Sequence, residues 1–321
     1  MSDKNKPKVF LTGGNGMVGK NILSHPLSSK FDFFAPGRKE LDLTNFDLLV
    51  DYINNLKPDF VIHTAGHIGG INASVQNPVD FFLKNLDIGR NVIVAAHQAK
   101  IKRLINLGSS CMYPRNAPNP LSEESILKGE LEDTNEGYAL AKISIQRLCK
   151  YIHAEDNKFQ YKTVIPCNLY GCFDKFDTYR AHLIPAIIYK LHHIIKEGKT
   201  ECEIWGDGTA RREFMYAGDF ADAILHALDN FSSMPSLLNI GTGVDHTINE
   251  YYSVVADLMG YEGGFVHNLV KPVGMSQKLV SIDKQTAWGW NPTSTLREGI
   301  QKTYSCYLQG KIYEGKEYGK L

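Results

Sequence analysis

The chain has 321 residues, of which 43% are hydrophobic and 22% are charged, and its 35 basic residues balance its 35 acidic ones. This length suits one or two domains, and the neutral balance excludes a global charge that would favour nucleic acid or an anionic membrane as partner. No stretch approaches the ~18 apolar residues of a membrane helix, and the apolar run after the polar start is shorter than the ~7 to 15 residues of a signal-peptide core. We expect a cytoplasmic globular protein.

The cysteines are dispersed through the chain and show no Cys-x-x-Cys spacing. This pattern argues against a disulfide framework and against a zinc site, so we expect reduced thiols and no metal. The six are Cys111, Cys149, Cys167, Cys172, Cys202 and Cys306.

A β-rich run over residues 8–12 is followed by a glycine turn and then by helix-compatible sequence over residues 20–27. Gly13 permits a tight turn, Gly16 lets the backbone approach a pyrophosphate, and Gly19 lets helix and strand pack closely. The N-terminus of the helix supplies N–H groups to phosphate. The spacing Gly-x-x-Gly-x-x-Gly is the form found in extended short-chain dehydrogenases/reductases. The expected cofactor contacts in this turn are Gly13, Asn15, Gly16, Met17, Val18 and Gly19.

A second strand over residues 31–35 should end beside the adenine ribose of a dinucleotide. NAD enzymes place an acidic residue there, whereas an arginine nearby accommodates a 2′-phosphate. Here Arg38 and Lys39 follow the strand, and no acid occurs until Glu40. The two cations favour NADP, the alternative being a solvated basic turn. Asp42 is expected near the adenine, as in relatives of this class.

A helix over residues 46–55 leads to a buried strand over residues 58–66 and to a glycine-containing loop over residues 67–72. His67 in this loop is a candidate contact for the nicotinamide or a sugar, although loop histidines are more often solvated. Apolar residues at helical spacing predict a long helix over residues 78–100. Asn85 and Asn91 on that helix have no assigned chemistry.

The next strand, over residues 104–107, delivers Ser109, and a helix over residues 136–152 carries Tyr138 and Lys142. Residues four apart share a helix face, so the Lys142 ammonium is expected to favour ionisation of the Tyr138 phenol by lowering its pKa. Ser109 and Tyr138 can hydrogen-bond the same substrate oxygen, which predicts reduction of a carbonyl by hydride from a nicotinamide. The alternative is that Tyr-x-x-x-Lys occurs here by chance, as it does in many helices.

A further strand over residues 161–166 is expected to continue as a loop over residues 168–171, where Asn168 is placed near the nicotinamide. After Gly171 the strand–helix alternation gives way to irregular segments rich in aromatic residues and cations. We expect a helix over residues 180–196 with His182 near its start, and a turn-linked pair of short strands over residues 203–214. Trp205 could stack on a flat base while Arg212 pairs with phosphate, and the alternative for Trp205 is an ordinary core position.

Three further assignments complete the chain. Asp219 is expected to cap a helix of the first domain, residues 238–243 to form a strand and turn, and the Trp288–Trp290 pair to lie mainly in the second lobe. The fold class is α/β, a Rossmann-type doubly wound parallel sheet with a smaller α+β substrate-binding lobe. The expected division is residues 1–171 and 215–245 for the NADP-binding domain and residues 172–214 and 246–321 for the lobe.

Several specific strings resemble the GDP-L-fucose synthase family, NADPH-dependent epimerase-reductases that act on GDP-4-keto-6-deoxymannose. They are Leu107-Gly-Ser-Ser-Cys-Met-Tyr-Pro114, Thr134-Asn-Glu-Gly-Tyr-Ala-Leu-Ala-Lys142, Asn168-Leu-Tyr-Gly171, His182-Leu-Ile-Pro-Ala186 and Trp205-Gly-Asp-Gly-Thr-Ala-Arg-Arg-Glu-Phe214. The resemblance covers nearly the whole chain and implies a homodimer formed by the helices over residues 81–99 and 138–152.

The resemblance also implies site residues. Ser109, Tyr138 and Lys142 match the family's reductive residues, and Cys111 and His182 match its epimerisation pair. Further implied cofactor contacts are Leu107, Lys142, Asn168 and His182, and the implied GDP-sugar contacts are Lys190, Trp205, Arg212 and Lys278.

The chain departs from the family at two positions. His67 stands where the family usually has lysine, and Asn15 stands where bacterial members often have arginine, which leaves a 2′-phosphate to Arg38 and Lys39. Two alternatives to an epimerase-reductase remain open. One is a related enzyme of the same fold, either a 4-epimerase that keeps its NAD or a reductase without epimerisation. The other is a non-catalytic NADPH-binding regulator, which would have no need of Ser109, Tyr138 and Lys142 together.

Overall fold

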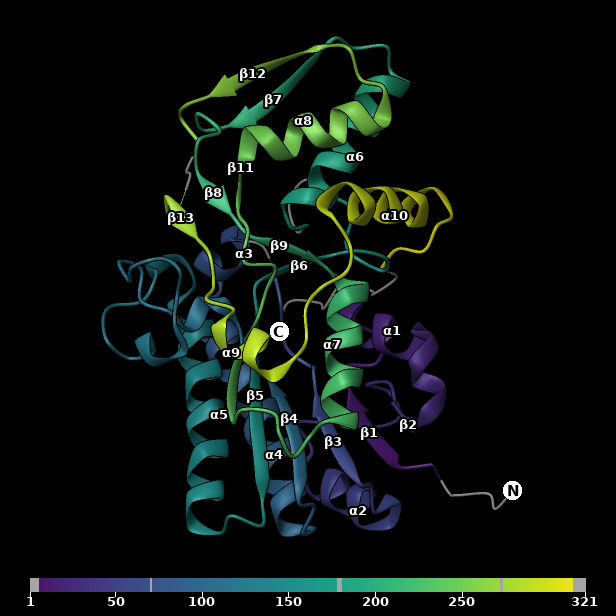
Figure 1. The fold of residues 1–321 in the computed structure, drawn as a ribbon, viewed down its shortest axis with the longest axis vertical. Coiled ribbons are helices and arrows are strands. Elements are labelled where there is room, and N and C mark those ends of the chain that lie inside the picture. Colours follow the sequence, from purple (N-terminus) through teal and green to yellow (C-terminus); the bar gives the residue numbers. More distant parts are fainter. Residues whose placement is uncertain (1–5, 70, 178–180, 272–273, 314–321) are drawn as a thin grey trace.

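The computed structural model describes residues 6–69, 71–177, 181–271 and 274–313, without the side chains of Ile71 and Asn72. Gly70 and Arg180, which fall within segments discussed above, lie outside the described residues. Figure 1 shows a sheet flanked by helices in its lower half and a smaller group of helices and short strands above it. None of the described helices is long and apolar enough to cross a membrane.

Six strands form one parallel sheet in the order β10-β5-β4-β3-β1-β2. Their bounds are β1 Lys8–Thr12, β2 Asp32–Phe34, β3 Phe60–His63, β4 Arg103–Leu107, β5 Gln160–Pro166 and β10 Leu237–Ile240. The doubly wound parallel sheet expected from the sequence is confirmed, and each predicted strand has its observed counterpart within a few residues.

Helices flank both faces of this sheet (Figure 1). They are α1 Met17–Ser24, α2 Phe46–Leu56, α3 Ile71–Gln76, α4 Pro78–Gln98, α5 Glu136–Glu155 and α7 Ala217–Asp229. The exception among them is α3, which packs against α4. Short 3-10 turns also occur, namely η1 Pro26–Lys30, η2 Ser110–Met112, η3 Glu123–Ser125 and η4 Asp133–Asn135.

Alternate residues of β1 enter different cores because successive side chains of a strand point to opposite faces. Leu11 packs in the core that contains Ile22 of α1 and Phe220 of α7. Phe10 packs in the core that contains Ile53 of α2 and Ile93 of α4. Burial on both faces explains why β1 is almost continuously apolar.

The upper part has its own core, which includes Ile188, Tyr251 and Ile300. Its helices are α6 Leu183–Lys196, α8 Ile248–Met259 and α10 Leu296–Leu308, and α9 Asp283–Trp288 packs back against β10. Its strands are β6 Asn168–Tyr170, β7 Glu201–Trp205, β8 Arg211–Arg212, β9 Phe214–Tyr216, β11 His246–Thr247, β12 Gly264–Asn268 and β13 Gln277–Lys278.

Several local expectations were wrong because tertiary pairing decided them. The segment after β5 is not a loop, since β6 pairs in parallel with β9. The strands over residues 203–214 do not pair with each other, because β7 pairs with β12 and β8 lies between β11 and β13. Trp290 packs in the core beside the main sheet, and Trp288 packs against that core.

Asp219 does not cap α7. Tyr216 occupies the N-cap position, and the Asp219 carboxylate instead accepts hydrogen bonds from the Ser294 N–H at 2.9 Å and the Ser294 hydroxyl at 2.9 Å. Asp219 therefore ties α7 to the segment that leads into α10, a contact between positions 75 residues apart.

The expectation of six reduced thiols was also wrong. Cys172 and Cys306 form a disulfide with a Cα–Cα distance of 5.3 Å, across a sequence separation of 134 residues. The bond joins α10 to the segment that follows β6. The two cysteines become neighbours only in the folded chain, so their spacing in the sequence does not predict the disulfide.

Candidate active site

The glycine turn after β1 has the geometry that a dinucleotide requires. Gly13 has φ +75°, and a Cβ on it would lie 2.7 Å from the Ala65 nitrogen. A Cβ on Gly19 would lie 2.3 Å from the Gly13 carbonyl oxygen, so only glycine allows α1 to approach the turn. Gly16 is the N-cap of α1 and no side chain caps that helix, which leaves its N-terminus as a phosphate site. The residues present therefore fit a dinucleotide cofactor.

The turn after β2 is arranged by its own charged residues. Arg38 pairs with Asp42 at 3.4 Å, and Asp42 also accepts a hydrogen bond from the Thr44 hydroxyl at 2.8 Å. The Glu40 carboxylate folds back to accept from the Gly37 N–H at 2.7 Å. Glu40 thus stabilises the turn, while Arg38 and Lys39 remain its basic side chains. Asn15 is close by, since a Cβ on Gly37 would lie 3.0 Å from the Asn15 amide nitrogen.

The structure brings together the three residues expected to reduce a carbonyl. Ser109 follows the end of β4, and Tyr138 and Lys142 project from the first turns of α5. The Ser109 hydroxyl forms a hydrogen bond with the Tyr138 phenol. The Lys142 ammonium donates to the Leu107 carbonyl oxygen at 2.8 Å, which ties α5 to the end of β4.

The expected effect of Lys142 on Tyr138 was wrong. Burial, reinforced by Cys111, raises the pKa of Tyr138 above its ordinary value, although the Ser109 hydrogen bond acts in the opposite direction. The Lys142 ammonium lies 5.8 Å from the Tyr138 ring centroid, and burial lowers its pKa to about 8. Desolvation disfavours the charged form of both groups.

Cys111 lies in the 3-10 turn η2, which Ser109 caps. Its N–H donates to the Ser109 hydroxyl oxygen at 3.2 Å, and its sulfur accepts from the Asn135 amide at 3.4 Å and from the Lys278 ammonium at 3.7 Å. His182 occupies the N-cap position of α6 without a capping hydrogen bond. Desolvation and the charges of Lys175 and Lys278 lower the pKa of His182.

The upper part supplies the residues expected to hold a nucleotide. Lys190 donates to the Glu203 carbonyl oxygen at 2.6 Å and to the Tyr252 hydroxyl at 3.2 Å, and burial lowers its pKa. Trp205 is 41% exposed, and its indole N–H donates to the Glu203 carboxylate at 2.8 Å. The Lys271 ammonium lies 5.1 Å from the Trp205 ring centroid.

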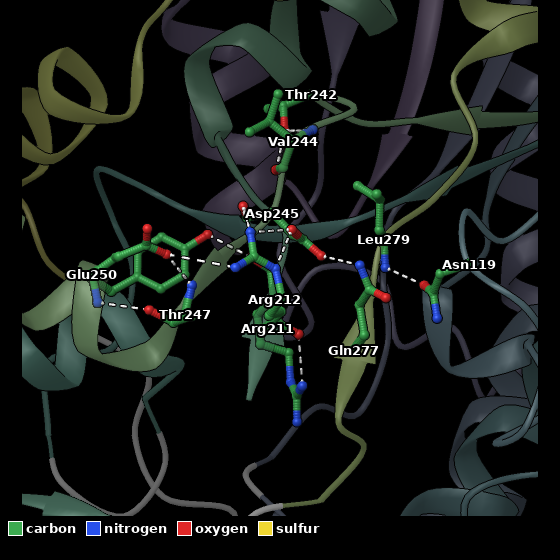
Figure 2. Close-up of polar contacts among 11 residues, drawn as sticks. Asn119, Arg211, Arg212, Thr242, Val244, Asp245, Thr247, Glu250, Gln277 and Leu279 are labelled. Carbon is green, nitrogen blue, oxygen red and sulfur yellow. Dashed lines mark hydrogen bonds and ion pairs between the residues drawn. The ribbon is translucent and has the colours of Figure 1, made fainter. Parts of the chain in front are cut away.

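Hydrogen bonds to the Asp245 carboxylate fix the orientation of the strands that carry Arg212 and Lys278. Asp245 accepts from Arg211 at 2.8 Å and from Gln277 at 2.7 Å, and Figure 2 shows its carboxylate between the two side chains. Because side chains alternate along a strand, the next residues, Arg212 and Lys278, face the opposite way. They are paired in register on β8 and β13. Burial lowers the pKa of Arg212.

Two asparagines act in ways that sequence reasoning missed. Asn85 of α4 accepts from the His67 N–H at 2.8 Å and donates to the His67 carbonyl oxygen at 3.0 Å, so it holds the loop after β3. Asn135 contacts Cys111 as described. An asparagine inside a helix with apolar spacing is the feature of the sequence that could have identified Asn85.

Asn168 donates to the Glu213 carbonyl oxygen at 2.8 Å, which links β6 to the segment between β8 and β9.

Two cavities differ in their distance from these residues. A cavity of about 160 Å³ adjoins Tyr138 and is lined also by Asn135, Phe81 and Ser74. A larger one, of about 550 Å³, lies at the opposite ends of the strands, beside Arg103 and Gln160, and contains none of the expected site residues.

Comparison with known proteins agrees with this geometry. The model of the NAD dependent epimerase/dehydratase family matches residues 9–241. The GDP-L-colitose synthase of Yersinia pseudotuberculosis is 52% identical over 95% of this chain and 99% of its own length. The GDP-L-fucose synthase of Azorhizobium caulinodans is 46% identical, with 96% and 98% covered.

A solved structure is similar over the same extent. A GDP-mannoheptose C4 reductase from Campylobacter jejuni with NADP bound is 30% identical, with 96% of this chain and all of that chain covered and a TM-score of 0.85. The resemblance read from the sequence is confirmed, and this chain belongs to the NAD dependent epimerase/dehydratase family, among relatives that include GDP-L-fucose and GDP-L-colitose synthases.

Proposed function

We propose that this protein is an NADPH-dependent epimerase-reductase that converts GDP-4-keto-6-deoxymannose to GDP-L-fucose. It inverts C3 and C5 and then reduces the C4 ketone. The observation that carries the proposal is the convergence of Ser109, Tyr138 and Lys142 with Cys111 on one short segment and one helix face. The relatives named above support the choice of a GDP-linked keto sugar.

For the reduction, the Ser109 and Tyr138 hydroxyls would hydrogen-bond the C4 carbonyl oxygen and polarise it. Bound NADPH would supply the hydride to C4. A Tyr138 phenol with a raised pKa is fully protonated at neutral pH, so it is ready to donate its proton to the oxygen as negative charge develops there. Lys142, held by the Leu107 carbonyl oxygen, would contact the nicotinamide ribose.

For the epimerisation, protons on the carbons beside a ketone are acidic because the resulting carbanion delocalises into an enolate. The hydroxyls of Ser109 and Tyr138 would stabilise that oxyanion. Inversion then requires one group that removes a proton and another that returns a proton from the opposite face. Cys111 and His182 would fill these two roles.

For the cofactor, Gly13, Gly16 and Gly19 with the N-terminus of α1 would hold the pyrophosphate, and Arg38 and Lys39 would take the 2′-phosphate. Leu107, Asn168 and His182 would line the nicotinamide end. Further contacts would come from Asn15, Met17, Val18 and Asp42.

For the substrate, Trp205 would stack on the base, and the cations would bind the diphosphate and sugar. These cations are Lys190, Arg212 and Lys278.

The assembly and location remain proposals of the same kind. We infer a homodimer built from α4 and α5, because Val79 and Leu83 of α4 and Leu140 and Tyr151 of α5 are exposed large side chains. We also infer a cytoplasmic location and a two-lobe division at Gly171, except that α9 and Trp290 pack with the main sheet. The separate core around Ile188 supports the division.

The proposal is tested by running the reaction in deuterated water with NADPH and analysing the product by mass spectrometry and NMR. We expect deuterium at C3 and C5. Cys111→Ser should suppress this labelling far more than it suppresses reduction of a ketone that is already epimerised. A product without carbon-bound solvent deuterium would mean that the protein is a reductase only.

A second candidate is the same chemistry on a related GDP-linked 4-keto sugar. The 52% identity to a GDP-L-colitose synthase and the presence of His67 at a position near the site favour testing it. A panel of GDP-4-keto sugars, assayed with NADPH, would rank the substrates by kcat/KM.

A further inference from the structure

Two nitrogen donors converge on the sulfur of Cys111. The Asn135 amide approaches it to 3.4 Å and the Lys278 ammonium to 3.7 Å. The two donors come from different parts of the molecule, since Asn135 precedes α5 and Lys278 lies in β13, 167 residues from Cys111. Two such donors on one sulfur favour its anionic form, because both hydrogen bonds strengthen when the sulfur carries a negative charge.

The side chain of Asn135 does not serve the helix that it precedes. Asn135 is the N-cap residue of α5, where asparagine ordinarily accepts a hydrogen bond from the first turn, yet no such bond is formed. Its amide nitrogen is directed to Cys111 instead, and its buried amide oxygen has no hydrogen-bond partner among the described residues. Local stability therefore does not explain this orientation.

The direction of Lys278 is imposed by the strand that carries it. Its neighbour Gln277 is bound to Asp245 on one face, so Lys278 projects from the other face beside Arg212. From there its charge acts on both members of the proposed epimerisation pair, since it contacts Cys111 and contributes to the lowered pKa of His182.

We propose that Lys278 and Asn135 are positioning residues that hold Cys111 as a thiolate, so that Lys278 serves proton transfer at the sugar as well as nucleotide binding. This inference rests on the proposed function. In the step that it serves, a C–H proton passes to the thiolate sulfur, and the electron pair of that bond delocalises to the C4 oxygen. The thiol that forms is neutral. A proton then passes from the imidazolium form of His182 to the other face of the carbon, while the electron pair returns from the C4 oxygen to form the new C–H bond and leaves a neutral imidazole.

The test measures the reactivity of the Cys111 sulfur directly and needs no substrate. Among the described residues Cys111 is the one free cysteine that is not buried, whereas Cys149, Cys167 and Cys202 are buried. Its alkylation by iodoacetamide at pH 7 is therefore followed by mass spectrometry of the intact folded protein, with Cys111→Ser identifying the modified site. Only the thiolate reacts at an appreciable rate.

We expect Lys278→Met to slow alkylation of Cys111 by about tenfold, and Asn135→Leu by roughly threefold, because each removes one donor that stabilises the thiolate. Lys278→Arg keeps the charge and should stay close to the wild-type rate. Lys128→Met removes a charge from an exposed loop position and is the matched control. Lys278→Gln replaces Lys278→Met if the latter does not fold, as judged by its melting curve.

Equal alkylation rates in folded Lys278→Met and wild type would overturn the inference, whatever the enzyme's substrate. Failure of the proposed function is a separate result, because it appears as wild-type product without solvent deuterium. The kinetic counterpart uses substrate. If Lys278 only binds the nucleotide, Lys278→Met raises KM and leaves kcat for deuterium incorporation unchanged, whereas the inference expects that kcat to fall.

Discussion

Tyr138 is the proposed proton donor of the reductive step. Tyr138→Phe keeps the aromatic ring but removes the proton that the C4 oxygen must receive, so we expect turnover to fall by roughly 10² to 10⁴. Binding of NADPH should survive, since the ring and Lys142 remain in place. Steady-state kinetics and fluorescence titration with NADPH measure the two effects. Near-normal turnover would contradict the assignment.

Arg38 and Lys39 are the proposed contacts of the cofactor's 2′-phosphate. In the Arg38→Ala/Lys39→Ala double variant we expect the preference for NADPH over NADH to fall by roughly 10- to 100-fold, because charged hydrogen bonds to a 2′-phosphate contribute about 1.5 to 3 kcal/mol. The ratio of kcat/KM for the two cofactors is the measurement, and Lys128→Ala is the control. An unchanged ratio would mean that other groups read the 2′-phosphate.

At the scale of elements, the disulfide joins α10 to the segment after β6, and that segment also contacts α1 because Asn21 donates to the Cys172 carbonyl oxygen at 2.9 Å. Three distant segments thus meet at one point. A covalent link across a long loop restricts the unfolded chain, which is how such bonds stabilise proteins.

We therefore expect Cys306→Ser to lower the free energy of unfolding by about 2 to 4 kcal/mol. Urea denaturation under non-reducing conditions measures this change. Dithiothreitol should shift the wild-type midpoint toward that of the variant and leave the variant unchanged. Alkylation of Cys172 and Cys306 in the unreduced, denatured wild type would show instead that the bond does not form in solution.

At the scale of the whole molecule, the proposed homodimer would cover the exposed apolar residues of α4 and α5. A two-fold pairing of these helices would bury Val79, Leu83, Leu140 and Tyr151 and produce a four-helix bundle. We expect light scattering at micromolar concentration to give twice the chain mass of 36.0 kDa. Leu83→Glu, which places charge in this surface, should shift the protein to monomer, whereas Lys128→Glu should not. A wild-type monomer mass would reject the dimer.

The sequence by itself determined the parts of this protein that depend on neighbouring residues. The apolar run of β1, the glycines at positions 13, 16 and 19, and the helical spacing of α4 and α5 each specify their local structure, because backbone geometry and side-chain periodicity act over a few residues. The strings around Ser109 and Tyr138 likewise identified the family, and they predict the reductive residues.

Tertiary structure alone decided the contacts between distant positions. The Cys172–Cys306 bond, the link from Asp219 to Ser294 and the approach of Lys278 to Cys111 join residues separated by 134, 75 and 167 positions. A short stretch of sequence does not predict these contacts, because the two residues of each pair lie far apart in the chain. Burial also depends on tertiary structure. The direction of the Tyr138 pKa shift follows from how much water the folded chain removes from the phenol, and the sequence near Tyr138 does not specify that amount.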